Sequence, residues 1–162
     1  DTDTAINPDG VEIINDNIDQ DCNGQDLVTC AADYMIASQA QLNSMVHCGI
    51  IDGYLYIQAN VTNLLPLHNL TTITGHLVIR NTSALTNLSG LEQLHTVEEF
   101  VSIQQNAALL DLEGLSTLNS VGDNFYIHDN GFLCQTEVDA VFADENLSIV
   151  GSVTTYGNND GC

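Results

Sequence analysis

The sequence predicts a mainly β protein, a short right-handed β-helix or leucine-rich solenoid of about four coils. Capping helices at both ends and an irregular acidic arm in front complete this prediction. Three observations support it: an internal repeat of apolar residues, a two-residue alternation at the start of each repeat, and 44% hydrophobic residues in a chain of 162. That composition provides enough apolar side chains for a sizeable core.

The internal repeat has a period of 24 residues and contains no gap. One copy of the pattern reads Leu77, Ile79, Leu85, Leu88, Leu91, Leu94, Val97, and the next reads Val101, Ile103, Leu109, Leu112, Leu115, Leu118, Val121. A preceding copy begins at Leu55 and is shorter by two residues, and a fourth begins at Phe125. Each copy starts with alternating residues, which predicts a strand. Apolar residues then recur at every third position, which fits a coil that turns corners and stacks on its neighbours.

The elements are predicted in chain order from the acidic arm to the C-terminus. Residues 1–29 form a metal-binding arm, and 30–162 form the solenoid. A cap helix over about 31–46 would turn Ala31, Met35, Leu42 and Met45 inward. The coils cover about 50–133, because the repeat lies there. A C-terminal cap helix over about 135–146 places Val138, Val141 and Phe142 at helical spacing, and a strand over 147–156 follows.

The charge balance excludes two classes of partner. There are 22 Asp and Glu residues against a single Arg80 and no Lys, so the formal net charge is −21. Nucleic acids and anionic membranes are bound through Lys and Arg, so neither is expected as a partner. No apolar run approaches the roughly 20 residues of a membrane helix, so no membrane insertion is expected.

The acidic arm carries the candidate metal ligands. Nine of the 22 acidic residues fall within the first 33 positions. The stretch from Asp19 to Asp26 alternates oxygen ligands before a Gly, as an EF-hand-type loop does, but Cys30 takes the place of the twelfth-position Glu. Ca²⁺ is therefore the expected cofactor, and the arm can also be interpreted as a solvated linker. The candidate ligands are Asp1, Asp3, Asn7, Glu12, Asp16, Asp19, Asp21, Asn23 and Asp26.

Two resemblances follow from these motifs. The strand Gly75-His76-Leu77-Val78-Ile79, the run from Leu85 to Val97 and the closing Asn158-Asn159-Asp160-Gly161-Cys162 resemble the receptor L-domain family over residues 30–162. This resemblance implies a β-helical scaffold with a variable binding surface. The segment from Asp3 to Asp26 resembles the MopE-type metal-binding motif of bacterial surface proteins, although Ile14 stands where that motif has a Cys.

The five cysteines indicate disulfides and an oxidising, extracellular or cell-surface location. The L-domain resemblance and sequence proximity together pair Cys30 with Cys48 and Cys134 with Cys162. Cys22 is left over, which implies a free thiol or an intermolecular disulfide. Five sequons fit the same secreted location as possible N-glycosylation sites, at Asn60, Asn69, Asn81, Asn87 and Asn146.

No catalytic constellation is found, so the chain is predicted not to be an enzyme. Arg80 lies opposite Gln104 and His128 in the next coils, without an ordered carboxylate cluster. The first expected function is a secreted, calcium-stabilised structural module that assembles with copies of itself or with neighbouring modules into a fibre, coat or stalk. The alternative is a ligand-binding or adhesion module that recognises a protein or glycan. Its aromatic anchors would be Tyr54, Tyr56, Tyr126 and Tyr156.

Overall fold

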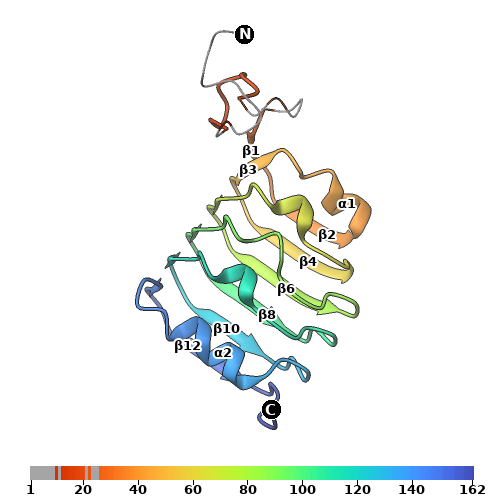
Figure 1. Cartoon of the computed structure of the whole chain (residues 1–162), viewed down its shortest axis with the longest axis vertical. Coiled ribbons are helices and arrows are strands. Elements are labelled where there is room, and N and C mark those ends of the chain that lie inside the picture. The colour runs from red at the N-terminus through yellow and green to blue at the C-terminus, as the bar shows by residue number, and fades with distance from the viewer. Residues whose placement is uncertain (1–9, 11, 21, 23–25) are drawn as a thin grey trace.

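The computed structural model describes residues 10, 12–20, 22 and 26–162. It contains two parallel six-stranded sheets that the chain visits alternately (Figure 1). The first, sheet A, has the order β1 (Val28–Cys30), β3 (Cys48–Ile51), β5 (Thr72–Ile73), β7 (Thr96–Val97), β9 (Ser120–Val121), β11 (Ser148–Ile149). The second, sheet B, has the order β2 (Tyr34–Ser38), β4 (Leu55–Asn60), β6 (Leu77–Thr82), β8 (Val101–Gln104), β10 (Phe125–His128), β12 (Val153–Tyr156). This alternation is consistent with the predicted solenoid.

The core is built from the repeated apolar positions. Leu77 pairs in register with Val101, and Val101 with Phe125, so equivalent residues of successive repeats lie side by side. All three side chains are fully buried. The single-turn helices η1 (Leu65–Leu67) and η2 (Glu113–Leu115) lie in the connections that lead from sheet B back to sheet A. Because each repeat adds one strand to each sheet, the inward side chains form one continuous core.

The predicted N-terminal cap helix over 31–46 is wrong for most of its length. The only helix there is α1 (Gln39–Asn43), and the residues before it form strand β2. Ile36 is buried while Met35, expected to face inward, is 57% exposed. The alternation of these side chains is that of a strand, and β2 pairs in parallel with β4. Tertiary pairing therefore overrides the helical spacing at this end, although Leu42 and Met45 are buried as expected.

The C-terminal end differs from the prediction in its boundaries. Helix α2 (Gln135–Phe142) ends four residues before the predicted limit. Val138 is fully buried, and the Phe142 ring meets Phe125 edge-on at 5.1 Å between centroids. The predicted strand over 147–156 is two strands, β11 and β12, because the chain passes from sheet A to sheet B between them. The sheets thus extend past residues 50–133 at both ends.

A column of polar side chains is buried at one edge of sheet B. Thr82, Asn106, Asn130 and Asn158 occupy successive repeats and are at most 8% exposed. The Asn106 Oδ1 accepts hydrogen bonds from the Thr82 backbone N–H (3.2 Å) and hydroxyl (2.8 Å). Its Nδ2 donates to the Ile79 carbonyl (2.9 Å) and to the Asn130 Oδ1 (3.2 Å). The Asn130 and Asn158 Nδ2 groups donate in the same way to the Ile103 and Ile127 carbonyls, so the column satisfies backbone groups of β6, β8 and β10.

Candidate functional site

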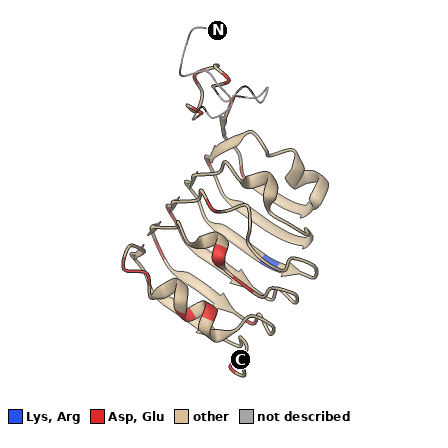
Figure 2. Cartoon of the chain, in the orientation of Figure 1, with Lys and Arg blue, Asp and Glu red and all other residues tan. Residues whose placement is uncertain are grey.

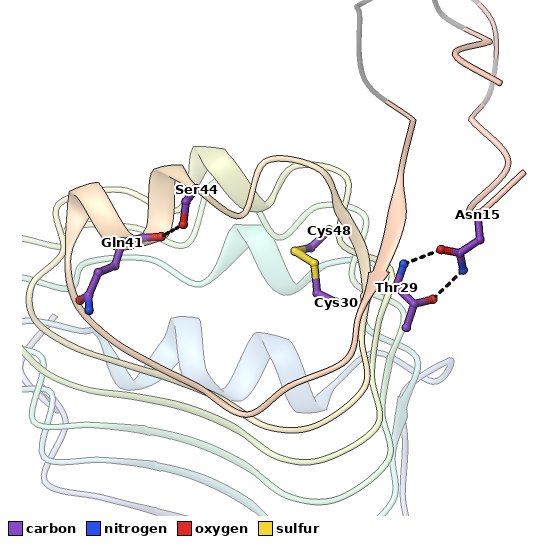
Figure 3. The surroundings of a disulfide bond; sticks show 6 residues. All are labelled: Asn15, Thr29, Cys30, Gln41, Ser44 and Cys48. Atoms are coloured by element: carbon purple, nitrogen blue, oxygen red, sulfur yellow. Dashed lines mark hydrogen bonds between the residues drawn. A yellow bond between two sulfur atoms is a disulfide. The ribbon is translucent and has the colours of Figure 1, made fainter. Parts of the chain in front are cut away.

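The arm before β1 is held to the sheets by Asn15. The Asn15 Oδ1 accepts a hydrogen bond from the Thr29 N–H (2.9 Å), and its Nδ2 donates to the Thr29 hydroxyl (2.8 Å; Figure 3). Gln20 is 4% exposed, and its Oε1 accepts from the Ile13 N–H. These contacts give the described part of the arm a defined conformation beside β1.

Of the nine candidate metal ligands, four are described: Glu12, Asp16, Asp19 and Asp26. Asp1, Asp3, Asn7, Asp21 and Asn23 lie outside the described residues. The Asp26 Oδ2 accepts a hydrogen bond from the Asn17 N–H (2.8 Å), which places Asp26 close to Asp16 in the chain fold. The other Asp26 oxygen is buried without a hydrogen-bond partner. The four described carboxylates do not form a group of three within 4.8 Å of one another.

The cysteines form the two disulfides implied by the resemblance. Cys30 is bonded to Cys48, which links the end of β1 to the start of β3 (Figure 3). Cys134 is bonded to Cys162. Cys22 is free and exposed. His47 lies near the first disulfide, and Cys30, His47 and Cys48 are the one group of three ligand-type side chains among the residues described. Because both sulfurs are already bonded to each other, neither is available as a thiolate ligand.

The outward face of sheet B carries the predicted tyrosines. Tyr56, Val78, Ser102 and Tyr126 are in register on neighbouring strands, so they form one row across the sheet. Val78 and Ser102 are each only 5% exposed although they point outward, and a larger tyrosine stands at each end of the pair. Neighbouring strands lie about 4.8 Å apart, so the two tyrosines span about 14 Å across four strands. This row, which we call the platform, has small residues in the middle that their neighbours cover.

An aromatic stack runs beside this row. The rings of Tyr54 and His76 stack at 4.8 Å between centroids, and those of His76 and Phe100 at 4.5 Å. Phe100 then meets Tyr126 edge-on at 6.3 Å. The His76 Nδ1 lies 3.2 Å from a Glu99 carboxylate oxygen, which fixes the imidazole ring within the stack. Four aromatic rings from successive repeats therefore form one continuous surface.

Arg80 lies on the same face of sheet B. Its guanidinium is 5.1 Å from the centre of the Tyr56 ring, a cation–π contact. Gln58 and Gln104 flank it in register, and His128 and Tyr156 continue that row, with their rings stacked at 4.6 Å. The Arg80 Nε is buried without a hydrogen-bond partner. In the described part of the chain the carboxylates within 4.0 Å of a basic side chain are Glu99, beside His76, and Asp129, beside His128, so Arg80 has no carboxylate partner there.

Acidic residues lie beside this platform rather than within its strands, since the Glu99 carboxylate contacts His76 and the Asp129 carboxylate contacts His128. Among the residues described, no Asp or Glu lies within a strand of sheet A or sheet B, and the blue segment in Figure 2 is the single Arg on sheet B. Sequence reasoning selected the tyrosines but missed His76 and Phe100. The signal was available, because these two residues are 24 positions apart and each immediately precedes the first inward residue of a strand.

The predicted glycosylation sites are divided by exposure. Asn60, Asn81 and Asn146 are exposed, whereas Asn69 and Asn87 are half-buried. The Asn87 Oδ1 also accepts a hydrogen bond from the Ser89 N–H (3.1 Å), which holds the local turn. The exposed three are therefore the better candidates for modification.

These features define a class of protein: a leucine-rich, parallel β scaffold stabilised by disulfides, with an aromatic platform on one sheet. Residues 47–146, more than half of the chain, match the Receptor L domain model, and the chain belongs to that family. Receptor L domains are extracellular ligand-binding modules rather than enzymes, which agrees with the disulfides. Comparison with curated proteins gives no match. Among the residues described, no helix is long and apolar enough to cross a membrane.

Proposed function

We propose that the chain is an extracellular ligand-binding or adhesion module whose ligand, a protein or a glycan, docks on the outward face of sheet B. The observation that carries the proposal is the aromatic platform around Arg80. Tyrosine and arginine are the residue types most enriched at binding hot spots. Membership of a ligand-binding family supports the same function.

The chemistry of the platform favours a ligand with flat apolar surfaces and hydrogen-bond acceptors. The rings of Tyr54, His76 and Phe100 offer stacking surface, while Arg80 and Gln104 offer donors beside it. A polyanion would be repelled by the net charge of −21, so the expected ligand is neutral or carries positive charge away from Arg80. This combination fits an uncharged oligosaccharide or a protein surface.

The experiment uses two probe sets: a panel of immobilised oligosaccharides without carboxylate or sulfate groups, and a phage-displayed peptide library. Any probe that binds the intact chain is tested against Tyr56→Ala and Arg80→Gln. Each change should weaken binding about tenfold or more, since hot-spot truncations cost about 2 kcal/mol. Phe132→Ala is the matched control, because Phe132 is 65% exposed and is not in sheet B. Equal binding by all four proteins would contradict the proposal.

Self-assembly is a second proposed function, supported by the outermost strands of sheet B. Met35 on β2 and Val153 on β12 are both exposed apolar residues on edge strands, and unpaired edges favour strand addition from another copy. The exposed Cys22 offers an intermolecular disulfide as a further link. Val153→Lys should lower the average mass measured by light scattering, because an edge lysine opposes strand pairing. A monomeric intact chain, with no dimer on a non-reducing gel, would contradict assembly.

Calcium binding by the arm is proposed as the stabiliser of that assembly. The residues fit a hard cation in one respect: the buried Asp26 oxygen lacks a partner, and a Ca²⁺ ion would provide one. Asp16 would contribute from the neighbouring turn. Titration calorimetry with CaCl₂ should show binding that Asp26→Asn weakens and that Asp123→Asn, an exposed change near β10, leaves unaltered. Identical binding heats for the intact chain and Asp26→Asn would show that Asp26 is not a calcium ligand.

A further inference from the structure

A groove lies between helix α2 and the segment around η2, residues 110–118, on the side where Figure 1 shows both helices. Its volume is about 460 Å³, within the range of about 300–1,000 Å³ typical of ligand pockets. Leu110, Leu112, Leu115 and Leu118 line one side, and Ala140 and Val141 line the other. The groove is separate from the outward face of sheet B, so the inference is independent of the proposed function.

The groove exists because α2 takes the place of a narrower connection. In the preceding repeat the equivalent leucines, Leu88, Leu91 and Leu94, are fully buried. Leu112, Leu115 and Leu118 line the groove but stay buried at 2–3% exposed, so its exposed apolar surface comes mainly from Leu110 and Ala140. An α-helix is about 10 Å across with its side chains, about twice the spacing of neighbouring strands. It therefore cannot stack on the η2 segment as closely as one repeat stacks on the next.

The rim of the groove carries four carboxylates, two from each side. They are Asp111 and Glu113 from the η2 segment, and Glu137 and Asp144 from α2 and the residues after it. One repeat earlier the positions of the first two are occupied by the uncharged Asn87 and Ser89. Figure 2 shows acidic residues on both helices that border the groove. No ion pair in the described part of the chain neutralises them.

An apolar wall also reaches the surface here. Leu110 is 53% exposed, whereas the equivalent position one repeat earlier is Thr86. The apolar residues that line the groove form its floor, and the four carboxylates form its rim. Such a groove is complementary to a chain segment that alternates apolar and positively charged side chains. A second copy of this chain does not supply such a segment, because the whole sequence contains one Arg and no Lys.

We propose that the groove binds a segment of a different polypeptide in which leucine-like side chains fill the floor and Lys or Arg side chains pair with the rim. Glu113 and Glu137 then lie on opposite sides of the bound segment. The apolar side chains of the segment insert between Leu115 on one side of the groove and Val141 on the other. The positive charges supply the specificity, and the apolar contacts supply most of the buried area.

The test measures fluorescence anisotropy of a labelled ten-residue peptide containing alternating leucine and lysine, with the intact chain. One control peptide replaces lysine by glutamate and another replaces leucine by serine. The double variant Glu113→Gln with Glu137→Gln keeps the shape and removes two charges, and should weaken binding about five- to tenfold at low salt. Ala140→Trp fills the groove and should abolish binding.

The matched control is Asp139→Asn with Glu145→Gln, which removes two charges from the same region without touching the groove lining. This control and Tyr56→Ala should bind the peptide as the intact chain does. Circular dichroism confirms that each variant is folded. Failure of the leucine–lysine peptide to bind, or equal binding by the charge control and the groove variants, would overturn the proposal.

Discussion

The buried asparagine column gives a quantitative prediction for Asn106→Ala. The change removes the acceptor of the Thr82 N–H and hydroxyl, and the donor to the Ile79 carbonyl. Thr82 is 1% exposed, so water cannot replace the lost acceptor without rearrangement. Each buried group left without a partner costs about 1–3 kcal/mol. We therefore expect the free energy of unfolding to fall by about 2–4 kcal/mol, a large part of a typical total of about 5–15 kcal/mol.

The assay is urea unfolding followed by circular dichroism, compared between the intact chain and Asn106→Ala. Gln93→Ala is the control, because Gln93 is exposed in a connection and such changes stay within about 0.5 kcal/mol. A loss below about 1 kcal/mol for Asn106→Ala would contradict this reasoning, because it would mean that the Thr82 groups find other partners at little cost.

Three further predictions concern stability and charge. Gly114→Ala should lower the free energy of unfolding by about 1–3 kcal/mol through overpacking, because the added Cβ would collide with the Leu88 carbonyl oxygen. Gly131→Ala is the control in the same urea assay, and it should be nearly neutral because no atom lies within 4 Å of the added Cβ. Replacing both Cys134 and Cys162 by Ala should lower stability by about 3 kcal/mol through the lost 28-residue loop closure; an unchanged unfolding midpoint would refute this. Calcium should lower the electrophoretic mobility of the native chain by neutralising charge in the arm, and a mobility unmoved by calcium would refute the arm as a cation site.

The repeat made the core predictable because its signal is dense and local. Leucines at three-residue spacing recur in a single register, and every inward residue from Leu77 to Val97 in that pattern is buried. The first repeat was harder to recognise. Residues 34–38 show apolar spacing that suits a helix as well as a strand, and only pairing with β4 decides between them.

The candidate site was partly visible in the sequence. The tyrosines could be selected by residue type, but the stack through His76 and Phe100 depends on the register between strands. The groove was not predictable, because it results from the width of α2 beside the η2 segment. The acidic rim is recognisable only once residues more than 20 positions apart are placed on opposite sides of one cavity.

The most direct test of ligand binding by sheet B is a nuclear magnetic resonance titration. The strongest-binding probe from the oligosaccharide and peptide panels is added to the isotopically labelled intact chain, and amide shifts are followed. The predicted shifts concentrate on β4, β6, β8 and β10, around Tyr56, Arg80 and Tyr126. Shifts confined to α2, the η2 segment or the arm, with sheet B unchanged, would contradict sheet B as the ligand-binding face.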